Sequence, residues 1–260
     1  MNRAMIQFED VFMSFGENEI LHGFNLNIPA QERMVIMGPS GVGKSTLLRL
    51  IVGILKPDRG TICVEGMNVP NLPSRALNKL RTKIGMVYQY SALISSLSVA
   101  ENLALPLREL TDLRPRQIDA EVEHALALVG MEETKSMMPS ELSGGMRKRV
   151  GIARALVMKP KIMLFDEPST GLDPVNSSII DELIINFTDQ AQVTSVIVTH
   201  EIKSAFRIAT RMAMLHQGRN IAEGLPEEMK NSRDPIVSQF LAGKTNGPIL
   251  KESKNAIPAA

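Results

Sequence analysis

The sequence predicts an α/β fold: a mixed sheet with an antiparallel β region and an inserted all-helical subdomain. Two observations support this prediction. Short apolar stretches alternate with helix-period stretches in residues 33–55 and again in residues 161–199, which is typical of parallel strands covered by helices on both faces. Between these two regions, residues 91–158 keep the helix period and lose the strand signals.

The first 90 residues are predicted to begin the sheet. Partly alternating polar and apolar residues predict strands within residues 4–37, namely "MIQFEDVFMSF", "LHGFNLNI" and "RMVIM". A helix, "KSTLLRLIVGIL", follows and is expected to stop at Pro57 and Gly60. The strand "TICVEG", a polar helix around residues 74–82 and the strand "KIGMVYQ" complete this first part of the core, residues 1–90.

The helical subdomain, residues 91–158, is predicted from "VAENLALPLREL", "RQIDAEVEHALALVG" and "GGMRKRVGIARALVMK". The second part of the core, residues 159–243, has the apolar strands "KIMLFD" and "TSVIVTH" with a helix at 175–189 between them. Two short strands near 212–216 and 219–223 predict a hairpin that turns at Gly218. A C-terminal tail, residues 244–260, shows little apolar periodicity.

Composition excludes several classes of function. The formal net charge of the 260 residues is +1, and there are no tryptophans and only two tyrosines, so no basic or base-stacking surface for nucleic acid is expected. Cys63 is the single cysteine, which fits a reducing cytoplasm. The N-terminus does not resemble a signal peptide, and no apolar run approaches about 18 residues, so we expect membrane contact only through a partner.

The stretch "GPSGVGKST", Gly38–Thr46, predicts a phosphate-binding loop. Its glycines allow the backbone to curl, so that several N–H groups point at one phosphate chain. Lys44 is placed to reach the β and γ phosphates, and the Ser45 hydroxyl is placed to bind Mg²⁺. The motif needs a strand before it and a helix after it, and the periodicity predicts both.

Asp166 and Glu167 end the apolar strand "KIMLF". The carboxyl edge of a parallel sheet is where ligands of such sheets bind. Asp166 is placed to hold Mg²⁺, directly or through water, and Glu167 is placed to accept a proton from an attacking water. Without the phosphate loop, the same pair could equally be an acidic loop start after a buried strand.

Gln89 and His200 also follow predicted strands. An amide at Gln89 could contact Mg²⁺ or the water and also move with the helical subdomain; the alternative is an exposed loop glutamine. A histidine at position 200 could bond the γ-phosphate; the alternative is a residue that merely begins a helix. His22, His124 and His216 lack such a position and are interpreted as structural or surface residues.

A second anion-binding feature lies about a hundred residues from the first. Ser143, Gly144 and Gly145 directly precede a basic, helix-period stretch in "SELSGGMRKRV", and N–H groups at such a helix start bind anions. A simple phosphate-loop kinase would not explain this stretch or the helical insertion.

Together these residues resemble the ATP-binding subunits of ABC transporters. The resemblance rests on "GPSGVGKST", Gln89, the signature "LSGGM", "IMLFDE", "GLDP" and His200, and covers residues 5–242. It implies ATP and Mg²⁺ as cofactors and a head-to-tail pair of two copies, each ATP lying between the phosphate loop of one copy and the signature of the other. Lys44, Gln89, Glu167 and His200 would then be catalytic, and Ser45, Gln89 and Asp166 the metal ligands.

The same resemblance gives the nucleotide contacts. They are Phe15, Gly38, Pro39, Ser40, Gly41, Val42, Gly43, Lys44, Ser45, Thr46, Gln89, Ser143, Gly144, Gly145, Asp166 and His200. Phe15 replaces the tyrosine that the family commonly stacks on adenine, and phenylalanine keeps the π-face needed for stacking. Arg147, Lys148 and Arg149 are predicted to form a solvated helix face near the dimer or permease contact.

A narrower resemblance is to the ATPases of Mla- and Mce-associated phospholipid transporters. It rests on "QYSALISSLSVAENLALPLRE", "PSELSGGMRKRVGIARAL" and "FLAGKTNGPI". It implies an integral-membrane permease, an Mce-domain lipid-binding protein and a small STAS-like subunit as partners. The subunit would be cytoplasmic and peripheral on the inner membrane. The tail would touch the other copy or the accessory subunit, unless it is a solvated terminus.

Two alternatives stay open at this point. The ATPase motifs do not distinguish a lipid transporter from an ABC transporter for another solute, such as an amino acid or a drug. A soluble ABC ATPase acting on DNA or ribosomes is disfavoured, because the chain has one ATPase half, one cysteine and a near-neutral charge.

Overall fold

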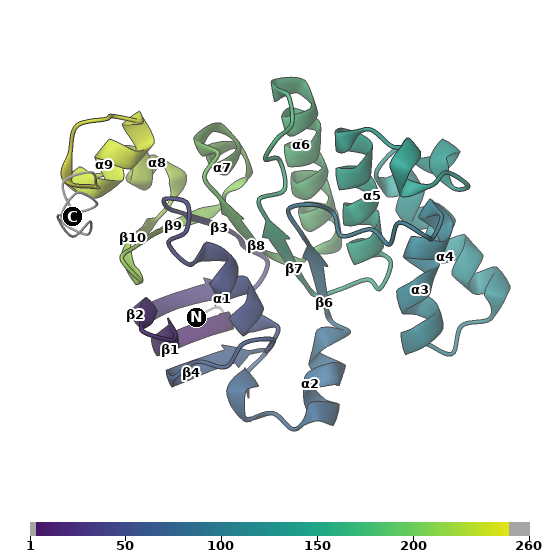
Figure 1. The fold of residues 1–260 in the computed structure, drawn as a ribbon, viewed down its shortest axis with the longest axis horizontal. Helices are drawn as coiled ribbons and strands as arrows, with labels where there is room; N and C mark the ends of the chain where they lie inside the picture. Colours follow the sequence, from purple (N-terminus) through teal and green to yellow (C-terminus); the bar gives the residue numbers. More distant parts are fainter. Residues whose placement is uncertain (1–3, 250–260) are drawn as a thin grey trace.

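The computed structural model describes residues 4–249, which form two sheets and the helices around them (Figure 1). The predicted α/β fold is confirmed. One sheet has the strand order β2-β1-β4-β5 and the other β10-β9-β3-β8-β7-β6. In the smaller sheet every pairing is antiparallel; its strands are β1 (Ala4–Phe15), β2 (Asn18–Pro29), β4 (Arg59–Val64) and β5 (Met67–Asn68).

The six-stranded sheet is mostly parallel. Strands β6, β7, β8, β3 and β9 pair in parallel, and β10 adds an antiparallel edge. Every residue of β7 and β8 is buried, as expected for parallel strands with helices on both faces. The bounds are β3 (Arg33–Met37), β6 (Ile84–Val87), β7 (Ile162–Asp166), β8 (Thr194–Thr199), β9 (Arg211–His216) and β10 (Arg219–Gly224).

Strand alternation divides the interior into two hydrophobic cores. In β3, Met34 and Ile36 belong to the core shared with α1 (Lys44–Ile51) and the antiparallel sheet, where the rings of Phe8 and Phe24 meet edge-on at 5.4 Å. Val35 and Met37 belong to the core on the other face, which α6 (Pro174–Ala191) and α7 (Ile202–Ile208) cover. Successive side chains of a strand point to opposite faces, so four consecutive residues of β3 contribute to both cores.

The segment between β6 and β7 is helical and lies at one end of the sheet (Figure 1). It contains α3 (Val99–Leu110), α4 (Pro115–Leu128), the short 3-10 turns Glu132–Thr134 and Pro139–Glu141, and α5 (Gly144–Leu156). A capping box between Ser98 and Glu101 begins α3, which satisfies backbone N–H groups at the helix start. The helix continues through Pro106.

The remaining helices are α2 (Ser74–Arg81), the 3-10 turn Val69–Asn71, α8 (Pro226–Lys230) and α9 (Pro235–Ala242). The periodicity did not predict α7, α8 or α9, which are short. The predicted tail, residues 244–260, lies partly outside the described residues; within residues 244–249, the amide of Ile249 donates to the side chain of Gln239 in α9. In residues 4–249, no helix has the length and apolar character that crossing a membrane requires.

At Gly85, α5 packs closely against the sheet. It lies buried in β6, and a Cβ there would be 2.6 Å from the carbonyl oxygen of Ala155 in α5 and 2.4 Å from the sulfur of Met163. The backbone oxygen cannot rotate away as a side chain could. The approach of α5 to the sheet therefore requires glycine at this position.

We expect Gly85→Ala to destabilise the chain by about 1–3 kcal/mol, the usual cost of overpacking a buried site. Urea unfolding measures the change. Gly144→Ala is the matched control, because a Cβ at Gly144 meets only Leu172, at 3.9 Å, and its free energy of unfolding should stay within about 0.5 kcal/mol of the parent. Equal stability of the Gly85→Ala and parent chains would contradict the close approach.

Candidate functional site

The loop between β3 and α1 curls back on itself. Gly43 is the N-cap of α1 with φ 106°, and a Cβ there would lie 2.6 Å from the Ile20 side chain. The Lys44 ammonium donates hydrogen bonds to the carbonyl oxygens of Gly38 at 2.8 Å and Pro39 at 3.0 Å. Burial lowers the Lys44 pKa, against the charges of Glu167 and Asp166. The loop thus forms a compact cradle that opens at the start of a helix.

Two carboxylates from the end of β7 meet this cradle. The Ser45 hydroxyl donates to Asp166 Oδ1 at 2.7 Å, and Lys44 Nζ lies 3.8 Å from Glu167 Oε1. Burial raises the pKa of Asp166, and the neighbouring charge of Glu167 adds to the effect, while the Ser45 hydrogen bond opposes it. The carboxyl ends of parallel strands share one edge of the sheet, which is why residues 121 positions apart touch.

Glu167 is held by donors on two sides. His200 Nδ1 lies 2.9 Å from Glu167 Oε1, and the Thr170 hydroxyl donates to Glu167 Oε2 at 2.9 Å. An ionised carboxylate only accepts hydrogen bonds, so we assign the imidazole proton to Nδ1. Burial alone would raise the pKa of Glu167, but the hydrogen bonds from His200 and Thr170 and the charges of His200 and Lys44 hold it below its ordinary value.

These groups line one cleft of about 360 Å³. The structure brings together the phosphate loop, Gln89, Glu167 and His200, as the sequence predicts; the lining residues are Ser40, Gly41, Gly43, Lys44, Ser45, Thr46, Gln89, Glu167 and His200. Asp166 is outside the lining and reaches the cleft through its hydrogen bond with Ser45. Gly38 and Pro39 support the cleft through their carbonyl contacts with Lys44. Val42 lines a neighbouring cavity together with His22 and Gly218.

Four predicted nucleotide contacts lie elsewhere. Ser143 caps α5 and accepts the backbone N–H of Met146, while Gly144 and Gly145 form the first turn. Phe15 ends β1 and is 46% exposed. None of these residues lines the cleft. Within one chain, the site therefore contains the phosphate loop and the carboxylates but not the signature.

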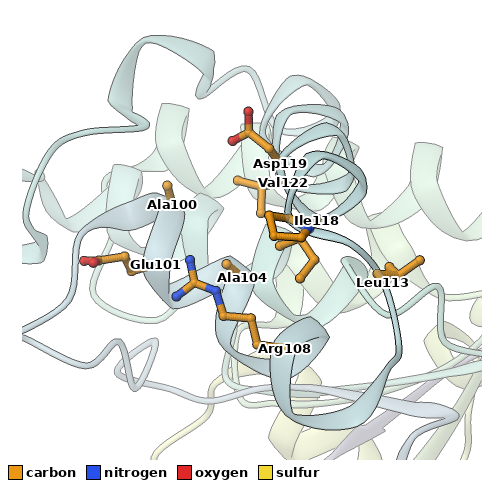
Figure 2. Close-up of a pocket in the computed structure, with 9 residues that line it drawn as sticks. Ala100, Glu101, Ala104, Arg108, Leu113, Ile118, Asp119 and Val122 are labelled. Carbon is orange, nitrogen blue, oxygen red and sulfur yellow. The ribbon is translucent and has the colours of Figure 1, made fainter.

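A second cavity, of about 420 Å³, lies between α3 and α4. Figure 2 shows Glu101 and Arg108 of α3 on one side of it, and Ile118, Asp119 and Val122 of α4 on the other. It contains no residue of the phosphate loop and neither Asp166 nor Glu167. The chemistry for binding phosphate is therefore in the first cleft, and this cavity is a separate feature of the helical segment.

One prediction was wrong. Lys148 was expected on a solvated helix face, but its side chain is 6% exposed and donates to the carbonyl oxygens of Gln89 and Glu167. Of its neighbours, Arg147 is exposed and Arg149 half-buried. The prediction failed because it treated three basic residues in a row as one surface. The spacing of Gly145, Lys148 and Ile152 on the buried face of α5 could have identified Lys148, because residues three and four apart share a helix face.

Thr170 was also missed. It follows Glu167 in "DEPST", and only the turn of the chain brings its hydroxyl back to the carboxylate. A polar residue three positions after a carboxylate is common in loops. The residues around it gave no signal that would have separated a donor to Glu167 from an exposed threonine.

The phosphate cradle, the acidic pair and the histidine define a P-loop ATPase. The family model described as ABC transporter matches residues 21–170. The chain is 37% identical to the intermembrane phospholipid transport system ATP-binding protein MlaF of Haemophilus influenzae, over 96% of this chain and 94% of that protein. It is 40% identical to the probable ribonucleotide transport ATP-binding protein mkl of Mycobacterium tuberculosis, over 96% of this chain and 70% of that protein.

A solved structure agrees with these relatives. It is a dimeric ATP-binding cassette in a post-hydrolysis state with ADP and Pi, and it superimposes with a TM-score of 0.79 at 33% identity. The match covers 85% of this chain and 99% of the cassette. The chain belongs to the ABC transporter family, as one of its ATP-binding and ATP-hydrolysing subunits.

We expect the Glu167 carboxyl to titrate below the ordinary glutamate value of about 4.3. Because its folded-state pKa is lowered, Glu167 contributes stability above about pH 4.3, and that stability is lost as the pH falls through the folded-state pKa. Thr170→Val removes one donor and should raise this pKa toward the ordinary value. Carboxyl ¹³C NMR of both chains measures it; a parent pKa above about 4.3, or one unchanged by the substitution, would contradict the assignment.

Proposed function

We propose that this chain powers the transport of phospholipid between membranes, as the ATPase of an Mla- or Mce-type system. The observation that supports this most is the similarity to MlaF, which extends over 94% of that protein's length. The site supplies the hydrolysis, and the choice of cargo belongs to partner proteins.

The proposed site roles follow from the contacts. Lys44 and the loop N–H groups bind the phosphates, and Glu167 accepts the proton of the attacking water. Both Glu167 oxygens are engaged by His200, Thr170 and Lys44. Each carboxylate oxygen can accept more than one hydrogen bond, so Glu167 can also accept one from the water. The phosphates draw Lys44 away, and His200 keeps the carboxylate oriented.

Mg²⁺ fits the residues present. Ser45 Oγ and Asp166 Oδ1 are 2.7 Å apart, and hydroxyl, carboxylate and amide oxygens are the ligands that Mg²⁺ takes. Residues 4–249 hold no cluster of three acidic, histidine or cysteine side chains for a metal. Mg²⁺ bound with substrate phosphates needs only one or two carboxylates. Ser45, Asp166 and Gln89 would hold it, and it would neutralise charge on the phosphates.

We propose a head-to-tail pair of two copies as the active unit. Ser143, Gly144 and Gly145 begin α5 outside the cleft of their own chain, so the N–H groups there are available to the ATP of a second copy. Phe15, also outside the cleft, would stack on the adenine. The related cassette with ADP and Pi is a dimer, which supports this arrangement.

We also propose an integral-membrane permease as a partner, docked on the helical segment, residues 91–158, beside the Gln89 loop. Tyr90, next to Gln89, is 86% exposed, and a large exposed aromatic side chain is typical of a protein contact. The division of the core into residues 1–90 and 159–243 around this segment makes it the part that transmits closure. Through the permease the chain would be peripheral on the cytoplasmic side of the inner membrane, with an Mce-domain protein and a STAS-like subunit as further partners.

Complementation tests the head-to-tail pair. We expect Gly144→Asp to abolish hydrolysis, because its carboxylate faces the phosphate of the opposite copy, while an isolated chain still binds ATP. Lys44→Ala should be inactive because the cradle loses its charge. An equal mixture of the two regains activity at up to about a quarter of the sites, because half of the pairs are mixed and each has one intact site. A phosphate-release assay measures the rates; a mixture as inactive as its components would contradict the composite site.

Glu167→Gln tests both the base and the cargo. The variant should bind ATP but hydrolyse it about 10²-fold more slowly, because the amide does not accept the proton. We expect the parent chain, purified with its native membrane partners and reconstituted, to drive ATP-dependent movement of labelled phospholipid between vesicles, and the variant to fail.

The second candidate function is ribonucleotide transport, which the similarity to mkl favours. A further experiment with ribonucleotide distinguishes it from phospholipid transport. The same vesicles are loaded with labelled ribonucleotide in place of labelled phospholipid. ATP-dependent ribonucleotide movement without lipid movement would replace the lipid proposal. Normal lipid transport by the Glu167→Gln variant would refute the role of this ATPase in it.

A further inference from the structure

We infer that Lys148 is a positioning residue for ATP hydrolysis, which holds the Glu167 peptide and the Gln89 loop against the signature helix α5. The inference rests on the proposed roles of Glu167 and Gln89. It starts from a cation that the predicted site does not use. Lys148 is 6% exposed, and it lies on the second turn of α5, close behind Ser143.

The contacts of Lys148 are specific. Its ammonium donates to the carbonyl oxygen of Gln89 at 2.5 Å and to that of Glu167 at 3.1 Å. These two residues follow the ends of β6 and β7, the neighbouring strands at the edge of the parallel sheet. One side chain thus joins two loops of the nucleotide cleft to the helix that carries the signature.

The Glu167 peptide needs such support. Glu167 has φ 50°, a left-handed conformation that costs energy for a residue with a side chain. Its N–H donates to the carbonyl of Val198 in β8 at 2.9 Å, and its carbonyl accepts from Lys148. The backbone is therefore fixed on both sides of the Cα atom that carries the carboxylate. Without Lys148 the carbonyl loses its closer donor and keeps the longer hydrogen bond from the Thr170 N–H, at 3.4 Å, and the peptide can turn toward an ordinary conformation.

The Gln89 loop is held by α5 at a second point. Ser91 and Ala92 also have positive φ, 60° and 48°, and the Arg154 guanidinium donates to both of their carbonyl oxygens, at 2.8 and 2.6 Å. Lys148 and Arg154 are six residues apart on α5. Arg154 fixes the far end of the loop, whereas only Lys148 reaches Glu167.

The charge itself fits this position. Burial lowers the pKa of Lys148, while the charges of Glu167 and Asp166 oppose the effect. A buried cation is retained where it is paired and hydrogen-bonded. A movement of α5 therefore moves the Lys148 ammonium, which is hydrogen-bonded to the Glu167 carbonyl. The signature helix and Glu167 are thus coupled through one side chain.

Lys148→Met tests the inference, because methionine keeps much of the apolar stem and removes the donors. We expect kcat for ATP to fall about 10-fold or more while KM stays within about 2-fold, since Lys148 touches no nucleotide-binding atom. Lys148→Arg should restore much of the lost kcat, because a guanidinium donates to carbonyls as well. Arg149→Met is the matched control: in residues 4–249 the hydrogen bonds of Arg149 go to the carbonyls of Val129 and Gly130, away from the nucleotide cleft, and kcat should be that of the parent.

A double variant, Lys148→Met with Glu167→Gln, distinguishes the positioning role of Lys148 from the proposed role of Glu167 as the base. If Lys148 acts through Glu167, the double variant should hydrolyse ATP no more slowly than Glu167→Gln alone, because residues acting as one unit are not additive. Losses that multiply, or a Lys148→Met kcat within about 2-fold of the parent, would overturn the inference while leaving the base intact. A parent rate in Glu167→Gln would instead refute the base.

Thermal unfolding of each variant is measured together with its rate of ATP hydrolysis. If Lys148→Met does not fold, Lys148→Leu, which also lacks a donor and is shorter than lysine, takes its place with the same expected split between kcat and KM. A loss of kcat that follows the loss of thermal stability in both variants and in Lys148→Arg would show a merely structural lysine, and would overturn the positioning role.

Discussion

The parallel alignment of β3, β8, β7 and β6 is the constraint on which the site depends. Each strand ends at the same edge of the sheet, and each delivers one component there: the phosphate loop after β3, the acidic pair at the end of β7, His200 after β8 and Gln89 after β6. Parallel strands need crossover connections, and these connections carry the helices of both cores. The same topology that buries the apolar strands therefore gathers the polar groups.

Burial and charge are balanced closely at this edge. Lys44, Lys148, Asp166 and Glu167 are each less than a tenth exposed, and an unpaired charge so buried would be costly. Burial raises the pKa of Asp166. The hydrogen-bond donors around Glu167 instead lower the pKa of Glu167. Two adjacent carboxylates at one sheet edge therefore differ in proton affinity.

The placement of α5 against the sheet determines where the signature at its N-terminus lies. Gly85 allows the helix to approach β6, and within α5 Gly145 lies close to Asn176 and Gly151 lies close to Ser91. The N-terminus of α5 is left pointing outside the cleft of its own chain. In the proposed pair this end of α5 completes the site of the other copy. Lys148 couples the position of α5 to the position of Glu167. A small shift of one helix can then alter the reacting centre of its own chain.

The sequence by itself determined the order of the main strands and the longer helices, the phosphate loop, and the candidate site residues Asp166, Glu167, Gln89 and His200; the short helices α7, α8 and α9 were not predicted. These signals are local: apolar periodicity, glycine spacing and a polar residue directly after a buried strand. The tertiary structure alone decided that Lys148 is buried and that Thr170 turns back to Glu167, because both contacts depend on what lies across the interface. It also shows the signature outside the cleft of its own chain, in keeping with the head-to-tail pair that the family resemblance implied. Periodicity shows which face of an element is covered; only packing shows which atoms cover it.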